Sequence, residues 1–287
     1  MAIVLRHHVG SRFVSREHGL ARGLYHAVST QMNAPHSRTP LFKTNGIGRM
    51  FGDATKALDR VTMTIEQGSV TSLLGPSGCG KSTLLRIIAG LDIATAGVMD
   101  WPGGALQTGE TGFVFQDATL LPWASVWDNV YLPFRISGTS RADAADAVDS
   151  VLRLVELDGF ADYCPRQLSS GMRMRVAVAR ALATKPRLLL MDEPFAALDE
   201  MTRFRLNDDL LPIQQDLGCT LLFVTHSVYE AVYLSRQVCV MTKRPGHVMA
   251  EIPIDLPWPR EPDMRTSSKF AMACRIVSDA LTGKVPA

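Results

Sequence analysis

The chain has 287 residues, of which 46% are hydrophobic and 20% are charged. This length and composition exclude a short peptide and a wholly disordered protein, and they are typical of one large folded domain or two ordinary ones. The formal net charge of +2 gives no general attraction for a polyanion, so charge offers no support for nucleic-acid binding.

The first segment, residues 1–40, differs in composition from the rest. It carries five Arg, one Glu and five of the seven His of the chain. It has no sustained helical or strand period, so we expect a poorly ordered basic leader. Its apolar opening is too short for a signal peptide. A transit peptide, a cationic membrane-surface segment and a metal-binding His tract stay open as minor alternatives to a solvated tail.

Neither a membrane span nor a disulfide framework is visible in the sequence. No stretch reaches the roughly 18 to 20 apolar residues that a spanning helix needs. The five cysteines are odd in number and lie at least 20 positions apart, which fits neither paired metal ligands nor disulfide bonds. We therefore expect a reducing, cytoplasmic setting.

The strongest motif is a glycine-rich loop after a short apolar run, residues 69–74, that predicts a buried strand. The loop reads GPSGCGKST and matches the phosphate-loop pattern, with a helix expected from Lys81. Its backbone N–H groups and the helix N-terminus favour an anion. Lys81 would reach the β- and γ-phosphates of a nucleotide, and the Ser82 hydroxyl would coordinate Mg²⁺. The predicted ATP-binding residues of the loop are Gly75, Pro76, Ser77, Gly78, Cys79, Gly80, Lys81, Ser82 and Thr83.

Cys79 stands inside this loop. We favour the interpretation that Cys79 has no chemical role and is a small residue at a position that the motif leaves variable. The neighbouring helix N-terminus and Lys81 nevertheless predict a reactive thiol, whose alkylation bound ATP would block.

A helical region follows, at about residues 117–172. Within it, residues 141–157 have apolar side chains at helical spacing, most of which we interpret as core packing. Next, LSSGMRMR at residues 168–175 opens a second amphipathic helix that is expected to run to about Ala183.

Two further apolar runs end at polar residues. Residues 187–194 read RLLLMDEP, which is typical of a buried parallel strand that ends at two carboxylates. Asp192 suits Mg²⁺ coordination, and Glu193 is placed to polarise a water in line with the γ-phosphate. The run from Thr220 ends at His226, whose imidazole could contact the γ-phosphate. A strand with a proline-rich exit and one helix near residues 264–281 complete the chain.

Six motifs in this order resemble the ATP-binding cassette (ABC) family, the motor subunits of ABC transporters. They are Walker A at Gly75, a glutamine loop at Gln116, the signature at Leu168, Walker B at Asp192, the D-loop and the switch His226. The resemblance implies an α/β fold, in which a RecA-like parallel-sheet core joins an antiparallel β subdomain and a helical subdomain. The cassette would span residues 41–250, and residues 251–287 would form a C-terminal extension with one helix.

The resemblance also implies roles for single residues. Phe51 would stack on adenine, whereas the sequence alone gives even odds that it belongs to the core. Gln116 would reach Mg²⁺ and the attacking water, which places it with Glu193 and His226 as catalytic and with Ser82 and Asp192 as a Mg²⁺ ligand. The remaining implied residues are those of the D-loop, Ala197, Leu198 and Asp199, and those of the signature, Leu168, Ser169, Ser170, Gly171 and Met172.

The signature would contact the ATP of a second subunit, so the resemblance implies a homodimer or a pair of similar cassettes. Here it departs from the usual LSGGQ at Ser170 and Met172, and the Ser170 side chain could slow closure of the dimer. The LSxGM form, LLPW at residues 120–123 and RPG at residues 244–246 look like the nitrate, sulfonate and taurine importer ATPases.

That subfamily implies ATP and Mg²⁺ as cofactors, a separate transmembrane permease and an extracytoplasmic solute-binding protein. It places the chain on the cytoplasmic face of the inner membrane, with a permease helix received near residues 120–129, where Trp123 and Trp127 are candidates for the contact. A soluble ABC-type ATPase acting on nucleic acid or ribosomes is the alternative. The segment between Gln116 and Ser169 is too short for the coiled coils of DNA-repair types. Ribosome-acting types carry two cassettes, whereas this chain has one. A phosphate-loop kinase would need no signature motif, so the LSSGMRMR segment argues against that class. Exporters often fuse the cassette to membrane spans, and no span is visible in this sequence.

Overall fold

The computed structural model describes residues 39–52 and 55–284. The leader predicted at residues 1–40 therefore lies outside the described residues, apart from its last two positions. Among the described helices, none combines the length and the apolar character that crossing a membrane requires.

The N-terminal part forms a three-stranded antiparallel sheet. It consists of β1 (Pro40–Phe51), β2 (Thr55–Glu66) and β4 (Ala96–Asp100), in the order β2-β1-β4. Val61, Met63 and Ile65 alternate along β2 and are fully buried, because successive side chains of a strand point to opposite faces.

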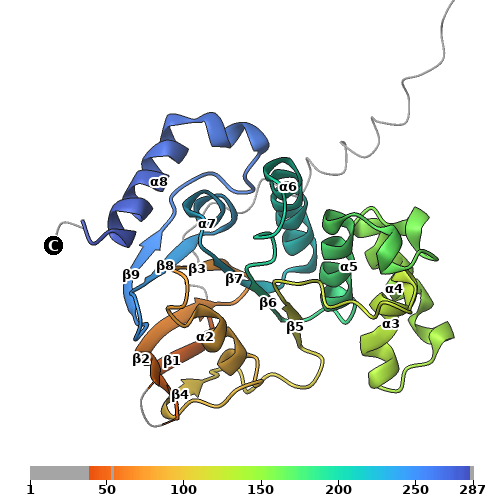
Figure 1. Ribbon diagram of the computed structural model, residues 1–287, viewed down its shortest axis with the longest axis horizontal. Coiled ribbons are helices and arrows are strands. Elements are labelled where there is room, and N and C mark those ends of the chain that lie inside the picture. Colours follow the sequence, from red (N-terminus) through yellow and green to blue (C-terminus); the bar gives the residue numbers. More distant parts are fainter. Residues whose placement is uncertain (1–38, 53–54, 285–287) are drawn as a thin grey trace, which may run out of the picture. The chain divides into compact units, whose positions relative to one another are not determined.

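A six-stranded sheet forms the centre of the molecule, in the order β5-β6-β7-β3-β8-β9 (Figure 1). Its first five strands run parallel, and β9 pairs antiparallel with β8. The strands are β5 (Thr111–Val114), β6 (Leu188–Asp192), β7 (Thr220–Thr225), β3 (Val70–Leu74), β8 (Gln237–Met241) and β9 (Val248–Pro253). This arrangement confirms the predicted α/β fold with a parallel core and an antiparallel β part.

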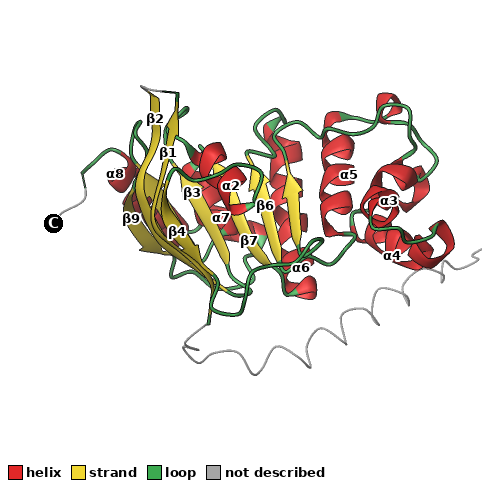
Figure 2. Ribbon diagram, turned by 90° about the horizontal axis from the view of Figure 1, so that it is seen from below, coloured by secondary structure: helices red, strands yellow, loops and turns green. Residues whose placement is uncertain are grey.

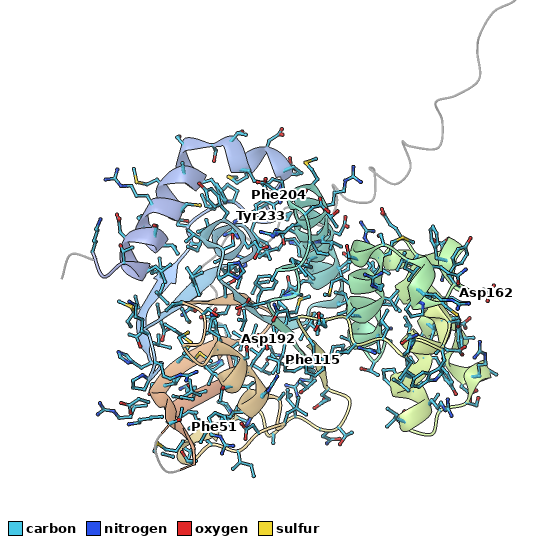
Figure 3. All side chains as sticks on the ribbon, viewed as in Figure 1. Phe51, Phe115, Asp162, Asp192, Phe204 and Tyr233 are labelled. Carbon is cyan, nitrogen blue, oxygen red and sulfur yellow. The ribbon has the colours of Figure 1, made fainter. Side chains whose placement is uncertain are left out.

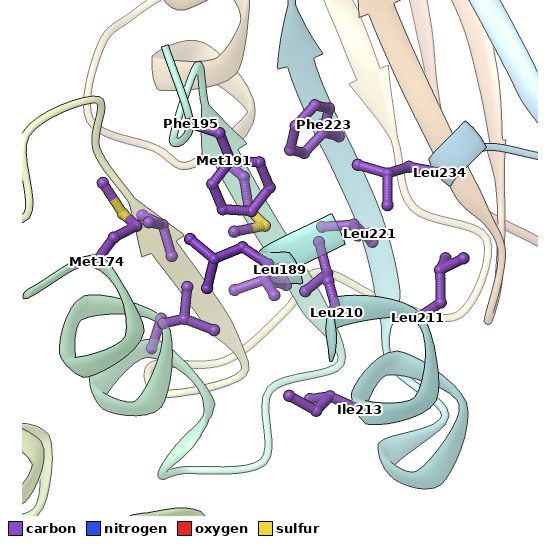
Figure 4. Close-up of a cluster of buried hydrophobic side chains, with 14 of the residues drawn as sticks. Met174, Leu189, Met191, Phe195, Leu210, Leu211, Ile213, Leu221, Phe223 and Leu234 are labelled. Atoms are coloured by element: carbon purple, nitrogen blue, oxygen red, sulfur yellow. The ribbon is translucent and has the colours of Figure 1, made fainter. Parts of the chain in front are cut away.

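The central strands are buried on both faces, which explains why they read as continuous apolar runs. In β6, Leu189 and Met191 belong to a cluster on the helical side, where they pack with Phe195 of the following turn (Figure 4). Leu188 and Leu190 point the other way, into a second cluster between the central sheet and the three-stranded sheet. Two cores therefore meet across one sheet and fix the positions of the strand ends.

Three α-helices lie beyond β5, at one end of the central sheet (Figures 1 and 2). They are α3 (Val126–Ile136), α4 (Arg141–Leu154) and α5 (Ser170–Leu182), with short 3₁₀ turns at Asp158–Phe160 and Pro165–Gln167. Each begins at a serine whose hydroxyl accepts a backbone N–H from the first turn, which is typical N-capping. The capping residues are Ser125, Ser140 and Ser169.

The remaining helices are α2 (Lys81–Ile88), α6 (Glu200–Leu217), α7 (Val228–Leu234) and α8 (Ser268–Leu281). Helix α2 follows β3 directly, and α7 packs against both β3 and α8. The C-terminal helix begins four residues later than residue 264, because a 3₁₀ turn at Pro262–Thr266 precedes it.

Candidate functional site

The phosphate loop lies between the end of β3 and the start of α2. The Lys81 ammonium is buried and donates to the carbonyls of Gly75 at 2.9 Å and of Pro76 at 3.1 Å. Gly80 has a φ of +107°, and a Cβ there would meet Leu58 Cδ2 at 2.6 Å, so only glycine fits. Among the described residues, no acceptor pairs with the backbone N–H of Gly78 or Gly80. This arrangement of donors and one cation suits a phosphate chain.

Asp192 is the last residue of β6 and lies in the interior of the molecule (Figure 3). Its Oδ1 accepts a hydrogen bond from the Ser82 hydroxyl at 2.8 Å. Burial raises the pKa of this carboxyl, while the Ser82 hydroxyl, Arg86 and Lys81 act in the opposite direction. The structure thus brings together the hydroxyl and the carboxylate that the sequence pairs with Mg²⁺.

Glu193 stands in the turn after β6, with a left-handed φ of +47°. Its N–H donates to the Val224 carbonyl of β7 at 3.0 Å. The side chain lies between two partners, with Oε1 3.6 Å from Lys81 Nζ and Oε2 3.2 Å from His226 Nδ1. Because a carboxylate oxygen accepts hydrogen bonds, this contact suits the imidazole tautomer that carries its proton on Nδ1.

A hydrogen-bonded network behind His226 was missed by the sequence analysis. Arg203 of α6 donates to the Leu198 carbonyl at 3.0 Å and lies 3.5 Å from a Glu230 carboxylate oxygen. Glu230 is buried in α7 and accepts from the Thr225 hydroxyl, which in turn accepts from the Ser227 N–H at 2.9 Å. A glutamate within a short apolar helix was the available signal, but its partner cannot be read from spacing.

The D-loop turns into α6 at Asp199. The Asp199 carboxylate accepts from the Thr202 N–H at 3.0 Å, and this hydrogen bonding lowers its pKa. Leu198 is buried, whereas Ala197 is exposed. Leu198 and Asp199 therefore fix the loop to the protein, while Ala197 faces solvent.

Gln116 is exposed and follows β5 after a single residue. The segment beyond it is fastened at two places that the sequence analysis did not identify. Arg180 of α5 donates to the carbonyls of Ala118 at 3.1 Å and Thr119 at 3.0 Å. The fully buried Asn129 accepts from the Leu121 N–H at 2.8 Å and donates to three carbonyls of residues 121–125.

The signature residues lie at the N-terminus of α5. Ser169 caps the helix, accepting from the Met172 N–H at 3.2 Å, and Leu168 is buried. Ser170 is exposed at the first helical position. A Cβ on Gly171 would meet Thr202 Cγ2 at 2.6 Å, so a larger residue there would displace the Thr202 side chain of α6. This helix lies beyond β5, whereas the phosphate loop follows β3, and β6 and β7 stand between them.

One expectation about a single side chain is wrong, and for another side chain the structure decides between two alternatives. Cys79 is 1% exposed and packs in the cluster between the two sheets, so its thiol is not accessible to a reagent. Phe51 is 43% exposed at the end of β1, beneath the Arg49 guanidinium at 4.6 Å, so it does not belong to the core (Figure 3).

Comparisons with known proteins agree with this geometry. A model of the ABC transporter family matches residues 58–196. The chain is similar to the nitrate import ATP-binding protein of Synechocystis sp., with 44% identity over 214 residues that cover 73% of this chain and 80% of the relative. It is also similar to the taurine import ATP-binding protein of Rhizobium johnstonii, with 45% identity over 207 residues that cover 71% and 79%.

A solved dimeric ATP-binding cassette in a post-hydrolysis state, bound to ADP and phosphate, has the same fold. The TM-score is 0.65 and the identity 31%, and the match covers 75% of this chain and all of that one.

Proposed function

Since the chain belongs to the family of ABC transporter ATP-binding proteins, we propose that it is the motor subunit of an importer for nitrate, taurine, a sulfonate or a similar solute. The chain is an ATPase of this family. In the proposal, two such subunits and a separate membrane permease form the working unit, supplied by an extracytoplasmic solute-binding protein. The chain would act at the cytoplasmic face of the inner membrane, held there by the permease.

For hydrolysis, we assign the general base to Glu193. Its Oε2 is held by His226 and its Oε1 faces the Lys81 ammonium, so the carboxylate is oriented from both sides. Glu193 would take a proton from the attacking water, and His226 Nε2 is free to face the terminal phosphate. Lys81 would bind the β- and γ-phosphates, Phe51 the adenine, and Gln116 the attacking water.

The pair formed by Ser82 and Asp192 fits Mg²⁺. A hydroxyl and a carboxylate oxygen 2.8 Å apart are hard oxygen donors of the kind that Mg²⁺ prefers, and few protein ligands are needed because the ion keeps several waters. Gln116, exposed next to β5, would complete the set. When bound, the ion would neutralise charge on the phosphates.

One observation carries the transport proposal. Trp123 is 78% exposed in the segment between Gln116 and α3, and this segment is fastened by Asn129 and by Arg180 of the signature helix. Trp127, by contrast, is engaged within the chain, donating to Asp149 and lying under Arg141. An exposed tryptophan on a segment that joins two nucleotide-contacting motifs suits contact with a permease.

The alternative of a soluble ATPase acting on nucleic acid or ribosomes is not favoured. The formal charge of +2 offers no polyanion-binding field, and the relatives above are named as importer subunits.

The proposal is tested by capture from membranes. Glu193→Gln protein, trapped with ATP, is incubated with detergent-solubilised host membranes, and the bound proteins are identified by mass spectrometry. We expect a polytopic permease, together with a solute-binding protein. Adding Trp123→Ser should remove the permease. Adding Met272→Ser should not, because Met272 is also an exposed apolar residue, 57% exposed, but lies on α8, far from α3 (Figure 1). Recovery of ribosomes or DNA-repair proteins without a permease would contradict the proposal.

A further inference from the structure

The hairpin between β8 and β9 carries Arg244 at its tip, within the RPG segment that the proposed function leaves without a role. The side chain of Arg244 reaches the phosphate loop, where its Nε donates to the Gly78 carbonyl at 3.1 Å. A Cβ built on Gly78 would stand 3.8 Å from Arg244 Nη2, so the guanidinium lies alongside the loop. The hairpin thus contacts the loop that binds phosphate.

This hydrogen bond fixes one end of the peptide group between Gly78 and Cys79. The other end of the same peptide, the Cys79 N–H, donates to the Pro76 carbonyl at 3.3 Å. Gly78 has a φ of +71° and no Cβ, so its own side chain does not restrict rotation of this peptide. The two hydrogen bonds therefore determine which way the peptide faces.

The hairpin that supplies Arg244 is itself anchored. Gly246 donates to the Ala57 carbonyl of β2 and accepts from the Asp59 N–H, both at 2.9 Å. A Cβ on Gly246 would meet the Cys79 carbonyl oxygen at 2.0 Å, so the hairpin backbone is in direct contact with the phosphate loop. Arg244 consequently starts from a backbone that is fixed against both β2 and the loop.

We propose that Arg244 is a positioning residue of the nucleotide site, which fixes the peptide between Gly78 and Cys79 through the Gly78 carbonyl so that the N–H groups of Gly78 and Gly80, unpaired within the described chain, stay available to the phosphates. A loop that is set before the nucleotide arrives loses less freedom on binding, and this raises affinity. The effect belongs to the binding of ADP and ATP and does not depend on which solute is transported, so it goes beyond the proposed function.

The test compares Arg244→Met with Lys243→Met in the full-length chain. Lys243 is the neighbouring exposed cation, and it makes no hydrogen bond with any residue that the structure describes. Both variants lose one positive charge, but only the first loses the bond to Gly78. MgADP affinity is measured by calorimetry, KM and kcat by steady-state ATP hydrolysis, and the melting temperature without nucleotide by calorimetric scanning.

We expect Arg244→Met to weaken MgADP binding and raise KM by about tenfold, the usual effect of losing a hydrogen bond from a charged donor. The kcat and the nucleotide-free melting temperature should stay near the parent values, and Lys243→Met should change neither affinity nor KM. Equal weakening in the two variants would overturn the proposal in favour of long-range charge attraction. An unchanged MgADP affinity, or a lowered melting temperature with KM and kcat both altered, would overturn it too.

Discussion

At the scale of single residues, Glu193 combines a strained backbone with a restrained side chain. A left-handed φ of +47° is unfavourable for a residue with a Cβ, and it persists because the Glu193 N–H is tied to β7. This conformation turns the carboxylate toward Lys81 and His226. The strain therefore serves the orientation of the side chain that we assign as the base.

Glu193→Gln should lower ATP turnover by at least about 100-fold, because a positioned general base contributes this much to a hydrolysis rate. The amide is close in shape to the carboxylate, so ATP binding should persist and trapped dimers should accumulate. Turnover is measured by phosphate release, and binding by titration with ATP. Lys81→Met provides the contrast, since it should weaken ATP binding itself. Undiminished turnover in Glu193→Gln would remove Glu193 from the role of base.

Cysteine labelling tests the corrected position of Cys79. Cys79, Cys219, Cys239 and Cys274 are buried, and burial raises the pKa of the Cys219 and Cys274 thiols to about 11. Native protein should therefore be alkylated at Cys164, which is partly exposed, and Cys79 should stay unlabelled with or without ATP. Peptide mapping by mass spectrometry reads the outcome. Labelling of Cys79 that ATP suppresses would restore the accessible thiol that we first expected.

At the scale of elements, one network joins the D-loop to the turn that carries His226. Arg203 holds the Leu198 carbonyl, and Glu230 connects Arg203 to Thr225 and through it to the Ser227 N–H. The loop after β6 and the loop after β7 are thereby fixed to a common pair of helices, α6 and α7. A shift of one loop would therefore displace the other through these contacts.

The pH dependence of stability should reveal the buried Glu230. Burial raises its pKa above the ordinary value of 4.5, outweighing the Thr225 hydrogen bond and the Arg203 charge. The folded state then binds more protons than the unfolded state between 4.5 and the raised pKa, so parent stability falls as pH rises through that window. Glu230→Gln lacks this decrease.

We therefore expect the melting temperature of Glu230→Gln, relative to the parent, to increase as pH rises from 4.5, when both are followed by circular dichroism. Glu261→Gln is the control, because the Glu261 side chain is exposed. A relative melting temperature that stays constant or declines across this window would show that Glu230 is not held with a raised pKa.

The sequence predicted the elements of the core well because their signals are local. Apolar runs marked β3, β6 and β7, and the glycine-rich motif identified the start of α2. The contacts of Glu193 and the bond from Arg244 to Gly78 could not be predicted, because they depend on the order of strands in the sheet and on a hairpin far away in the chain. Cys79 was misjudged for a similar reason. Its sequence neighbours are polar, whereas its side chain faces a second core.

At the scale of the whole molecule, the phosphate loop and the signature helix, which we propose as two parts of a nucleotide site, lie apart in the described chain. The phosphate loop follows β3, and the signature helix lies beyond β5. Three strand spacings, or roughly 14 Å, separate β3 from β5. Ser169 and Ser170 nevertheless present a hydroxyl and a helix N-terminus, which favour an anion. We expect a second copy to supply each missing part; the similar cassette described above was solved as a dimer.

This division of the site predicts complementation between two inactive variants. Lys81→Met impairs the phosphate loop and leaves the signature intact. Ser170→Glu does the reverse, since a carboxylate in the first turn of α5 should not destabilise the helix but would repel a phosphate. Each variant alone should be nearly inactive, because every site in its dimer combines one intact part with one impaired part. In a mixed dimer, one of the two sites pairs an intact loop with an intact signature.

An equimolar mixture should therefore recover a substantial fraction of parent ATPase activity, measured by phosphate release at several protein concentrations. Light scattering should show, for ATP-trapped Glu193→Gln, a species of twice the 31.4 kDa chain mass. Pairing Lys81→Met with a double variant that carries both Lys81→Met and Ser170→Glu is the control, since no intact site can form from those chains. Equal activity in the two mixtures would mean that the signature does not act across subunits, and the α5 N-terminus would then need a function within its own chain.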